Sequence, residues 1–589
     1  MKRTGTRATG DFHFKPYPII SNQPVYAQNG MVSSSQPFAS RVGVEILQKG
    51  GNAVDAAIAV SLMLNACEPW MSSPGGSSFY LLWDNAGKEM VALDACGVAP
   101  RAATPDAFRS REEMTRGLKA LTIPGSMAGH WELLSRYGTM SFAEVAEPAI
   151  RCLEEGFPMS NNSHTFMGRL PDILKTFPNL AATLAPGGEW PATGFLMKNP
   201  NLARTLRIVA EEGVDAFYRG SVAEEMVRYV REHGGLWTMK DLEDYRVQWK
   251  KPIRASYHDC DMYGTPPPAS TLTWMQAMKI AERFDWSELQ WGSAAALHLI
   301  TEIDKLAHSD GYNFVTDPDF VDIPLQELLS DAYAEAQAAR IDLGRAAPGR
   351  VAPGRPREWA KTGRPSGPLS LEGPRNASDP ANMVNKGCTT HICVVDGAGN
   401  AISLTNTVGT FFGGGDVLGD TGVLGTNGME WMDIDTNPWS SDNPSPLVIE
   451  PFKRNRWSLS PGILMKEGKP FILIGGAGGD TTQSGIFQAL LNMLQWDMNP
   501  QLAVSAPRTI YGDGRHYTGG TALGIEPELF GTSEELRRMG HDIIPKESFP
   551  AWTGFRPLTG SVLAIMIDGA SKTFAGAAEP RIDGYVSGY

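Results

Sequence analysis

The strongest constraint on the fold is a pair of apolar, β-branched runs, residues 387–396 and 401–407, that flank a short turn of Asp, Gly, Ala and Asn residues. This pattern predicts a β-hairpin. If the hairpin is symmetric about Ala398, Thr389 and Thr407 lie directly opposite each other. Opposed residues bring their Cβ atoms to roughly 5 Å, which is close enough for two hydroxyl groups to meet. The sequence therefore predicts a threonine pair at the open end of the hairpin.

A glycine-rich loop is the second informative motif. Residues 470–474 form a short apolar strand, and the apolar residues from Gln483 onward recur at helical spacing. A strand, then glycines, then a helix points backbone N–H groups at an anion beside a helix N-terminus. The loop, residues 475–480, has neither the Gly-Lys-Ser/Thr of a P-loop nor a dinucleotide fingerprint. Two interpretations remain: a site for an oxyanion, or a tight turn without a ligand.

Length, charge and hydropathy bound the class of protein. At 589 residues the chain exceeds the usual size of one hydrophobic core, so we expect two domains or one large two-part assembly. The net charge of -13 argues against nucleic acid or an anionic membrane as a partner, because both attract basic surfaces. Residues 1–30 contain no apolar run suited to a secretory signal, and no window is long enough to span a membrane. We therefore expect a cytoplasmic protein.

The cysteines and histidines lack the spacing of metal or disulfide sites. The six cysteines form no Cys-x-x-Cys pair, and the ten histidines form no His-x-x-x-His pair. The sequence therefore predicts neither a disulfide framework nor a zinc site, and no metal or organic cofactor is implied.

The chain changes character near residue 344. Before it, apolar helical stretches alternate with short strands such as residues 79–82. Residues 344–386 are rich in Pro, Gly, Arg, Ser and Asn, which predicts a mobile segment that extends to residue 388, just ahead of Thr389. After Thr389 the chain is rich in strands. The predicted helices include residues 54–64, 143–153, 203–210 and 294–306.

The Thr-Thr-His-x-x-Val-Val-Asp run that begins at Thr389, with its Gly-Asn turn, resembles the gamma-glutamyltransferase family of N-terminal-nucleophile hydrolases. Five further motifs resemble the family's signatures in the same order, so the resemblance covers most of the chain from about Gly30 to its end. These motifs are residues 50–57, 124–126, 266–270, 459–461 and 474–480, and the C-terminal residues 576–581 with Gly588-Tyr589 match as well.

The resemblance implies a four-layer αββα sandwich of the N-terminal-nucleophile hydrolase type, an α/β (α+β) fold in which two sheets lie between helical layers. It also implies that the precursor cuts itself before Thr389. Residues 1–388 and 389–589 would then form one intertwined unit. The new N-terminal amine titrates near pH 8, so it is a suitable base for its own hydroxyl.

The family's catalytic roles transfer to four residues. Thr389 is the implied nucleophile, and Thr407 is the second hydroxyl that supports it. The backbone N–H groups of Gly478 and Gly479 are the implied donors to the oxyanion. Cys388 and Cys393, on either side of Thr389, are alternative nucleophiles, and we expect both to be packing residues instead.

The substrate pocket departs from the family pattern. Cys96 occupies the position of the arginine that grips the substrate α-carboxylate, and a thiol does not replace a bidentate guanidinium. Arg101, Arg454 or Arg456 would restore a cation from another direction, or they are ordinary surface arginines. The other pocket positions that the resemblance marks are Thr390, Gly409, Trp431 (or Glu430, if the alignment slips by one), Trp457 and Ser458.

The loss of this amino-acid-binding set argues against γ-glutamyl substrates, because an unpaired zwitterionic head group costs several kcal/mol. We expect a self-processing threonine hydrolase or acyltransferase that cleaves a small-molecule, non-glutamyl acyl substrate: an aromatic or dicarboxylic amide, or a cephalosporin side chain. One alternative resembles the family's homologues in lincomycin-type antibiotic biosynthesis and hydrolyses a C–C bond. A second alternative is an inactive homologue that binds a ligand or partner. The fragments would stay associated, and a dimer of heterodimers is one assembly that the resemblance allows.

Overall fold

The computed structural model describes most of the chain. It covers residues 21–168, 170, 172–349, 351–356, 388–434, 445–511, 522–544 and 560–589. Within these residues, no helix is both long and apolar enough to cross a membrane.

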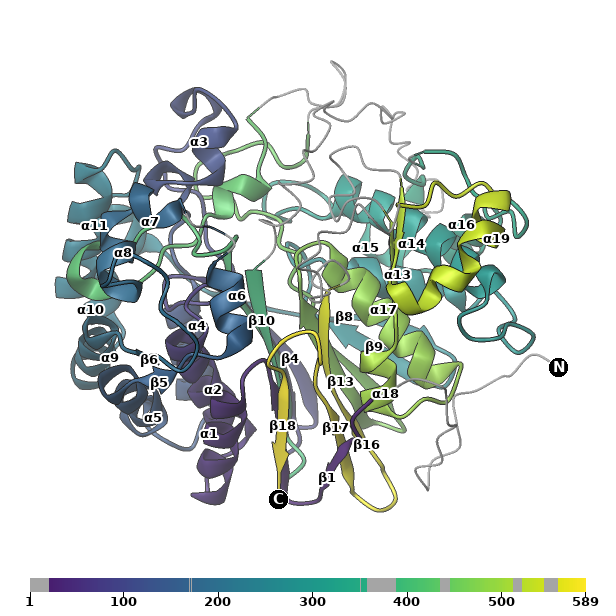
Figure 1. Ribbon diagram of the computed structural model, residues 1–589, viewed down its shortest axis with the longest axis horizontal. Helices are drawn as coiled ribbons and strands as arrows, with labels where there is room; N and C mark the ends of the chain where they lie inside the picture. The colour runs from purple at the N-terminus through teal and green to yellow at the C-terminus, as the bar shows by residue number, and fades with distance from the viewer. Residues whose placement is uncertain are drawn as a thin grey trace.

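Two seven-stranded antiparallel sheets form the centre of the molecule (Figure 1). The first has the order β1 (Val25–Ala27), β17 (Phe574–Ala577), β16 (Ser561–Ile567), β13 (Lys469–Ala477), β12 (Gly462–Lys466), β9 (Cys260–Gly264) and β8 (Ile253–Tyr257). The second has the order β18 (Tyr585–Gly588), β2 (Gly30–Ser34), β10 (Cys388–Asp396), β11 (Ala401–Gly409), β3 (Ser77–Asp84), β4 (Glu89–Ala95) and β7 (Gln248–Lys250).

Alternation of side chains along the strands gives the molecule three apolar interfaces. Between the sheets, Leu81 and Cys393 of the second sheet pack with Leu473 and Leu563 of the first. The outer face of the second sheet carries helices that include α1 (Pro37–Gln48), α2 (Ala53–Cys67), α5 (Phe142–Glu155) and α9 (Pro200–Glu212). The outer face of the first sheet carries α13 (Thr271–Ala281), α14 (Ala294–Phe314) and α17 (Thr481–Leu494). The predicted four-layer αββα sandwich is confirmed.

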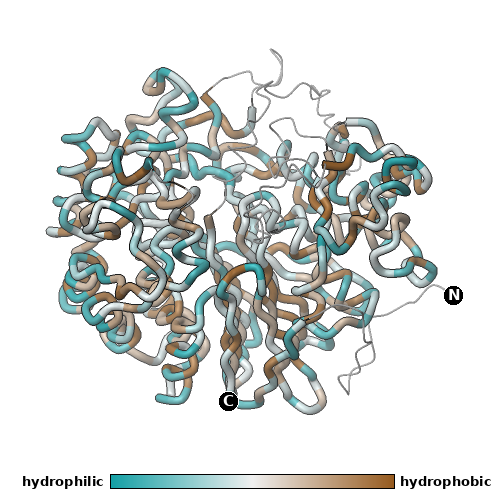
Figure 2. Tube along the Cα trace, in the orientation of Figure 1, coloured by the Kyte–Doolittle hydropathy of each residue, from teal (hydrophilic) through white to brown (hydrophobic). Residues whose placement is uncertain are grey.

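The sequence of helix α2 explains where this helix begins and why it is buried in the outer layer. The Asn52 side chain accepts hydrogen bonds from the backbone at Val54 and Asp55, and Asp55 bonds back to the Asn52 N–H, which forms a capping box. All residues of the helix are buried, which is typical of a helix that is apolar on all sides. Figure 2 shows hydrophobic segments in the central strands and in the helices on both sides of them.

Each sheet mixes strands from both sides of the predicted cut. In the second sheet, β10 and β11 lie between β2 and β3. In the first, β12 pairs with β9, and β17 pairs with β1. Neither residues 1–388 nor residues 389–589 therefore make a complete sheet, because each would leave strand edges without partners.

The described part of the predicted mobile segment is packed along α14. Lys305 Nζ donates to the Ala347 carbonyl at 3.0 Å, and Ser309 Oγ donates to the Val351 carbonyl at 2.8 Å. Residues 344–349 and 351–356 thus form a docked strap, held because polar side chains of α14 satisfy its backbone. Residues 357–387, with the rest of that prediction, lie outside the described residues.

Candidate active site

The hairpin β10–β11 places the two threonines as predicted. Thr389 pairs with Thr407, and the register shifts between Cys388 and Thr389. Thr389 Oγ1 donates to Thr407 Oγ1 at 3.2 Å, while Thr407 Oγ1 donates to the carbonyl of Cys388. The Gly409 N–H donates to Thr407 Oγ1 at 2.8 Å and holds that hydroxyl in place. The Thr407 hydroxyl therefore lies between the Thr389 hydroxyl and the carbonyl of the preceding residue.

His391 lies on the same face of β10 as Thr389, two residues along the strand. Its Nδ1 is 2.8 Å from Thr405 Oγ1 and its Nε2 is 3.3 Å from Cys393 Sγ. Burial lowers the pKa of His391 to about 3, so the ring is neutral. A Cβ at Gly475 would lie only 2.1 Å from this ring. The histidine is therefore a packing residue that requires glycine on the facing strand.

The glycine loop joins β13 to α17. Gly478 has φ +130° and Gly479 has φ +62°, both in the left-handed region that favours glycine. A Cβ at Gly478 would lie 2.8 Å from Gly560 Cα, so a side chain does not fit there. Thr481 Oγ1 donates to the Gly478 carbonyl at 2.9 Å and fixes the turn at the start of the helix.

The hairpin and the loop meet at the same end of the two sheets. Ser403, the partner of Cys393 in the hairpin, donates through Oγ to the Ile474 carbonyl at 3.1 Å. His391 in turn packs on Gly475. The facing strand is β13. Moving along β10 from Cys393 to Thr389 corresponds to moving along β13 from Ile474 toward Gly478. This direction brings the predicted nucleophile and the predicted oxyanion donors to one end of the sandwich.

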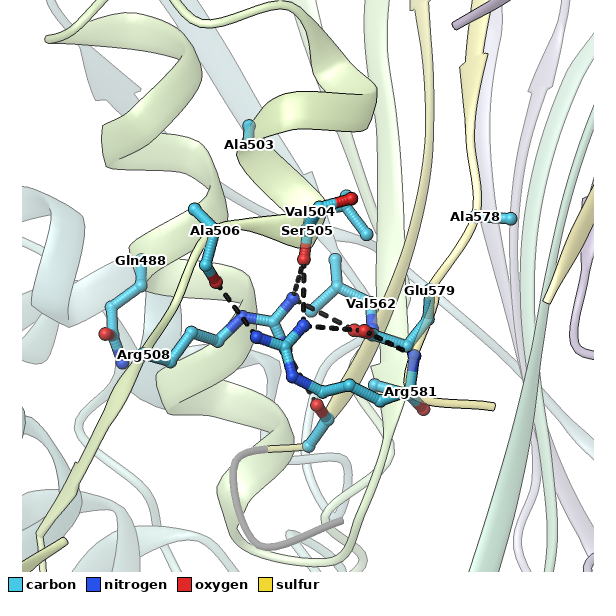
Figure 3. Close-up of polar contacts among 12 residues, drawn as sticks. Gln488, Ala503, Val504, Ser505, Ala506, Arg508, Val562, Ala578, Glu579 and Arg581 are labelled. Carbon is cyan, nitrogen blue, oxygen red and sulfur yellow. Dashed lines mark hydrogen bonds and ion pairs between the residues drawn. The ribbon is translucent and has the colours of Figure 1, made fainter. Parts of the chain in front are cut away.

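A buried ion-pair network joins Arg508, Glu579 and Arg581 (Figure 3). Arg508 donates to the Gly560 carbonyl at 2.7 Å and pairs with Glu579 at 2.9 Å. Arg581 pairs with Glu579 at 2.6 Å and with Glu526 at 2.5 Å. Gly560 packs directly against Gly478. By holding Gly560 in place, the network also fixes the position of the glycine loop. Removal of one partner would leave an uncompensated buried charge, which typically costs about 3–5 kcal/mol.

Asp480 connects the loop to the segment before β12. Its Oδ1 accepts from Ser458 Oγ at 2.8 Å and from Arg456 Nη2 at 2.9 Å. Arg456 is only 3% exposed, and its guanidinium lies 4.2 Å from the centre of the Tyr312 ring. Arg456 is thus a buried, ion-paired residue and not a surface arginine.

The other two arginines differ from Arg456. Arg454 is also buried, at 7% exposure, and lies within 4 Å of the carboxylates of Asp94, Asp317 and Asp319. Arg101 is half exposed and pairs with Asp241. Arg101 therefore lies at the surface, as expected for an ordinary surface arginine. Arg454 and Arg456 are instead buried with carboxylate partners that are distant in sequence.

The departures from the family pattern pack against one another. Cys96, Trp431 and Trp457 belong to a single buried apolar cluster. The two indole rings lie 5.5 Å apart at 51°. In the described part of the chain, neither indole N–H has a hydrogen-bond partner. We call this the indole cluster; its other members are Phe79, Ala269 and Leu459.

Gly409 completes this arrangement. It pairs with Cys388 and has φ +100°. A Cβ there would lie 2.0 Å from Asn427 Oδ1 and 3.3 Å from the ring of Trp457. The site has no room for a side chain at this position, because Asn427 and Trp457 fill it.

The remaining pocket candidates are polar residues that are not members of the apolar indole cluster. Thr390 points to the opposite face of β10 from Thr389, where its hydroxyl is 2.8 Å from Ser35 Oγ. Glu430 is buried and accepts from Asn427 Nδ2 at 3.0 Å. Sequence reasoning missed Asn427, although it lies in the stretch next to Glu430. It also missed the role of Arg508, for which no local pattern exists.

The cysteines near Thr389 are packing residues. Cys388 is part of the apolar layer beneath the outer helices, and Cys393 lies between the sheets. Burial strongly raises the pKa of the Cys393 thiol, which disfavours a thiolate nucleophile there.

Two sheets between helical layers, with a threonine hairpin and a glycine loop at one end, define an N-terminal-nucleophile hydrolase. A family model described as gamma-glutamyltranspeptidase matches residues 39–589, and the chain belongs to this family. It is 32% identical over 579 residues to the glutathione hydrolase proenzyme of Bacillus subtilis (strain 168), covering 95% of this chain and 92% of that one.

Solved structures agree with the family. The crystal structure of cephalosporin acylase from Bacillus halodurans matches with a TM-score of 0.83 and 29% identity, over 98% of this chain and 99% of that one. A structure of LmbA2991 matches with a TM-score of 0.82 and 25% identity, over 97% and 100%. The protein is therefore an enzyme of the hydrolase and acyltransferase class, and the non-catalytic interpretation is set aside.

Proposed function

We propose that this protein is a self-processing threonine hydrolase or acyltransferase that cleaves a non-glutamyl acyl substrate. The observation that carries the substrate assignment is the indole cluster. The positions that would bind an α-amino acid head group are filled by packed apolar side chains. Buried apolar surface cannot pair with a zwitterion, and leaving such a group unpaired costs several kcal/mol.

Self-processing begins at the bond between Cys388 and Thr389. Thr389 Oγ1 attacks the Cys388 carbonyl carbon, and Thr407 Oγ1 donates to the oxygen that becomes negative. The C–N bond then breaks, the nitrogen takes the proton, and the first fragment remains as an ester on Thr389. Breaking the C–N bond frees the amine of Thr389. Water then hydrolyses the ester, which releases the first fragment with a carboxylate at Cys388 and restores the Thr389 hydroxyl. The hydrogen bond from Thr407 to the carbonyl supports this role, because it acts on the bond to be broken.

Turnover repeats the same chemistry on a substrate. The free amine takes the proton from Thr389 Oγ1, which attacks the substrate carbonyl. The oxyanion is stabilised by the N–H groups of Gly478 and Gly479, each worth about 3 kcal/mol in comparable sites. Collapse expels the leaving amine and forms an acyl-enzyme. Water or an acceptor amine then releases the acyl group from Thr389.

We propose that the guanidinium of Arg456 contacts the end of the acyl chain that is distant from the scissile carbonyl. Its guanidinium lies 5.8 Å from the centre of the ring of Trp431, a member of the indole cluster. Its ion pair with Asp480 places it next to the glycine loop. An acyl chain with an apolar body and a terminal acceptor group fits this arrangement.

The test is a set of p-nitroanilides that differ in one group at a time. The glutaryl anilide lacks only the α-amine of the γ-glutamyl anilide, and the pentanoyl anilide lacks the carboxylate too. After intact-mass analysis has established the fragments 1–388 and 389–589, we expect kcat/KM to be highest for glutaryl or pentanoyl and lowest for γ-glutamyl. A preference for γ-glutamyl would overturn the substrate assignment, and an uncut chain would overturn self-processing.

A second candidate is hydrolysis of a C–C bond next to an oxo group. The resemblance to the family's homologues in lincomycin-type antibiotic biosynthesis favours it, and the chain matches a structure of LmbA2991 over 97% of its length. A tetrahedral adduct on Thr389 expels a stabilised carbon as readily as an amine, so the same residues serve. Release of the acyl acid from a 1,3-diketone, with no cleavage of the matched anilide, would support this candidate over the first.

A further inference from the structure

We propose that His298, Glu302 and His541 bind a divalent transition-metal ion, zinc in the first place. Their ligand atoms lie within 4.8 Å of one another, and the residues are 0%, 3% and 6% exposed. His298 and Glu302 are one turn apart on α14, so they share a face of that helix. His541 comes from the loop after α19 (Ser533–Arg538). Two imidazoles and a carboxylate form a ligand set that zinc uses, with water as the fourth ligand.

Backbone groups hold two of the ligands in the required orientation. His298 Nε2 lies 2.8 Å from the carbonyl of Asp342, which can only accept, so Nε2 carries the hydrogen. The lone pair on His298 Nδ1 is therefore directed at His541 Nε2, 2.8 Å away. Glu302 Oε2 accepts from the Ala347 N–H at 3.0 Å. A carbonyl behind a ligating histidine and a donor behind a carboxylate are typical outer-shell partners of metal sites.

The charges and protons at the site are compatible with a bound cation. Because His298 Nδ1 accepts, His541 Nε2 supplies the hydrogen of the bond between the two rings. Lys305 Nζ lies 2.7 Å from Glu302 Oε1 and 3.0 Å from the Ala347 carbonyl. Lys305 thus balances the charge of Glu302 and competes with a metal ion for this carboxylate. When metal binds, the hydrogen of His541 moves to Nδ1, so both facing nitrogens become ligands without net loss of a proton.

The position of the site gives the ion a structural role. His298 and Glu302 precede the predicted cut, and His541 follows it. Ala347 belongs to the strap that leads toward the cut, and Asp342 lies just before the strap. A metal ion here would connect the two fragments and fix the strap after processing. The link between the two fragments rests on the proposed cut before Thr389, whereas metal binding itself does not, so binding is tested in the uncut protein.

The experiment is metal binding to the full-length Thr389→Ala protein, a single chain in which processing does not interfere. After treatment with a chelator, cobalt(II) titration should give visible d–d bands that saturate at one equivalent per chain, and zinc should displace them. His541→Ala should weaken binding by more than about 100-fold, the upper range for loss of an outer-shell partner. His541→Gln serves if the alanine variant does not fold. His233→Ala, which changes an exposed histidine, should bind like the parent.

Lys305→Met separates a metal site from a hydrogen-bonded core cluster. At a metal site, loss of the competing cation should tighten zinc binding about tenfold or more, which corresponds to about 1.4 kcal/mol. Bound zinc should also raise the thermal unfolding midpoint of the parent and not that of His541→Ala. Absence of stoichiometric cobalt or zinc, or equal binding by His541→Ala and His233→Ala, would overturn the proposal.

Discussion

Two regions of the site differ in the interactions that hold them. One surrounds the proposed nucleophile, and the other, which we call the head-group side, is the indole cluster at the positions where family members bind the substrate's amino acid group. At the nucleophile side, Thr389 and Thr407 sit in a chain of hydrogen bonds that ends on the Cys388 carbonyl. At the head-group side, Cys96, Trp431 and Trp457 form an apolar cluster. The first arrangement requires particular donors and acceptors at fixed positions, whereas the second requires only volume and shape. The difference supports our proposal that this family member retains the reaction geometry while its recognition surface has been replaced.

The largest effect is expected at Thr389. Thr389→Ala removes the attacking oxygen, so the protein should remain one chain of 589 residues without activity. Thr389→Ser keeps a hydroxyl and should be cut, though more slowly. Intact mass under denaturing conditions and release of p-nitroaniline measure the two outcomes. A cut and active Thr389→Ala protein would contradict the mechanism.

A smaller but still large effect is expected in the glycine loop. Gly478→Ala places a Cβ 2.8 Å from Gly560 Cα at φ +130°, so the loop must shift and its N–H groups lose their direction. We expect kcat/KM to fall by about 100-fold or more. Gly468→Ala is the matched control, because Gly468 also has a positive φ, +73°, but open space around it. Equal activity of the two variants would show that the loop does not hold the oxyanion.

The head-group side is tested by adding back the missing cation. Cys96→Arg places a guanidinium in the indole cluster, where Cys96 Sγ now lies 3.2 Å from the Gly97 carbonyl. We expect no gain in γ-glutamyl turnover and a loss of about 3 kcal/mol of unfolding free energy, because the new charge is buried where Asp94 and Asp317 are already paired with other cations. Cys152→Arg, at a half-buried position of α5, should cost much less. Urea unfolding in the Thr389→Ala background measures both, and appearance of γ-glutamyl activity would refute the altered pocket.

The smallest effect is a pH dependence at Glu68, behind Thr390. Burial raises the pKa of Glu68 to about 8, and hydrogen bonds from Thr390 and Gln36 oppose this shift. The folded state therefore binds more protons than the unfolded state between about pH 4.5 and 8, and stability falls as the pH rises through this window. The slope is at most about 1.4 kcal/mol per pH unit.

Glu68→Gln should flatten this dependence, since the amide does not titrate. The comparison is the urea midpoint at pH 5 and pH 8 in the Thr389→Ala background. Glu335→Gln, at an exposed position of α16 (Asp331–Ala338), should leave the dependence as in the parent. An unchanged slope in Glu68→Gln would mean that the carboxyl is already ionised in the folded state.

Local patterns predicted the parts of the fold that depend on neighbours in sequence. The turn at Ala398 set the hairpin register, and the predicted helices at residues 54–64 and 294–306 lie within α2 and α14. The glycine loop also lies between the predicted strand and helix. These features follow from periodicity and turn chemistry, which act over a few residues.

The sequence by itself determined the threonine pair, the glycine loop and the family, because each is written in a short, contiguous motif. Only the tertiary structure decided which distant residues meet. It brought Cys96 against Trp457, Arg508 against Glu579, and His298 against His541. It also docked the strap on α14, although its composition favours a mobile segment. The physical reason is that burial and ion pairing depend on long-range packing, which no local spacing records.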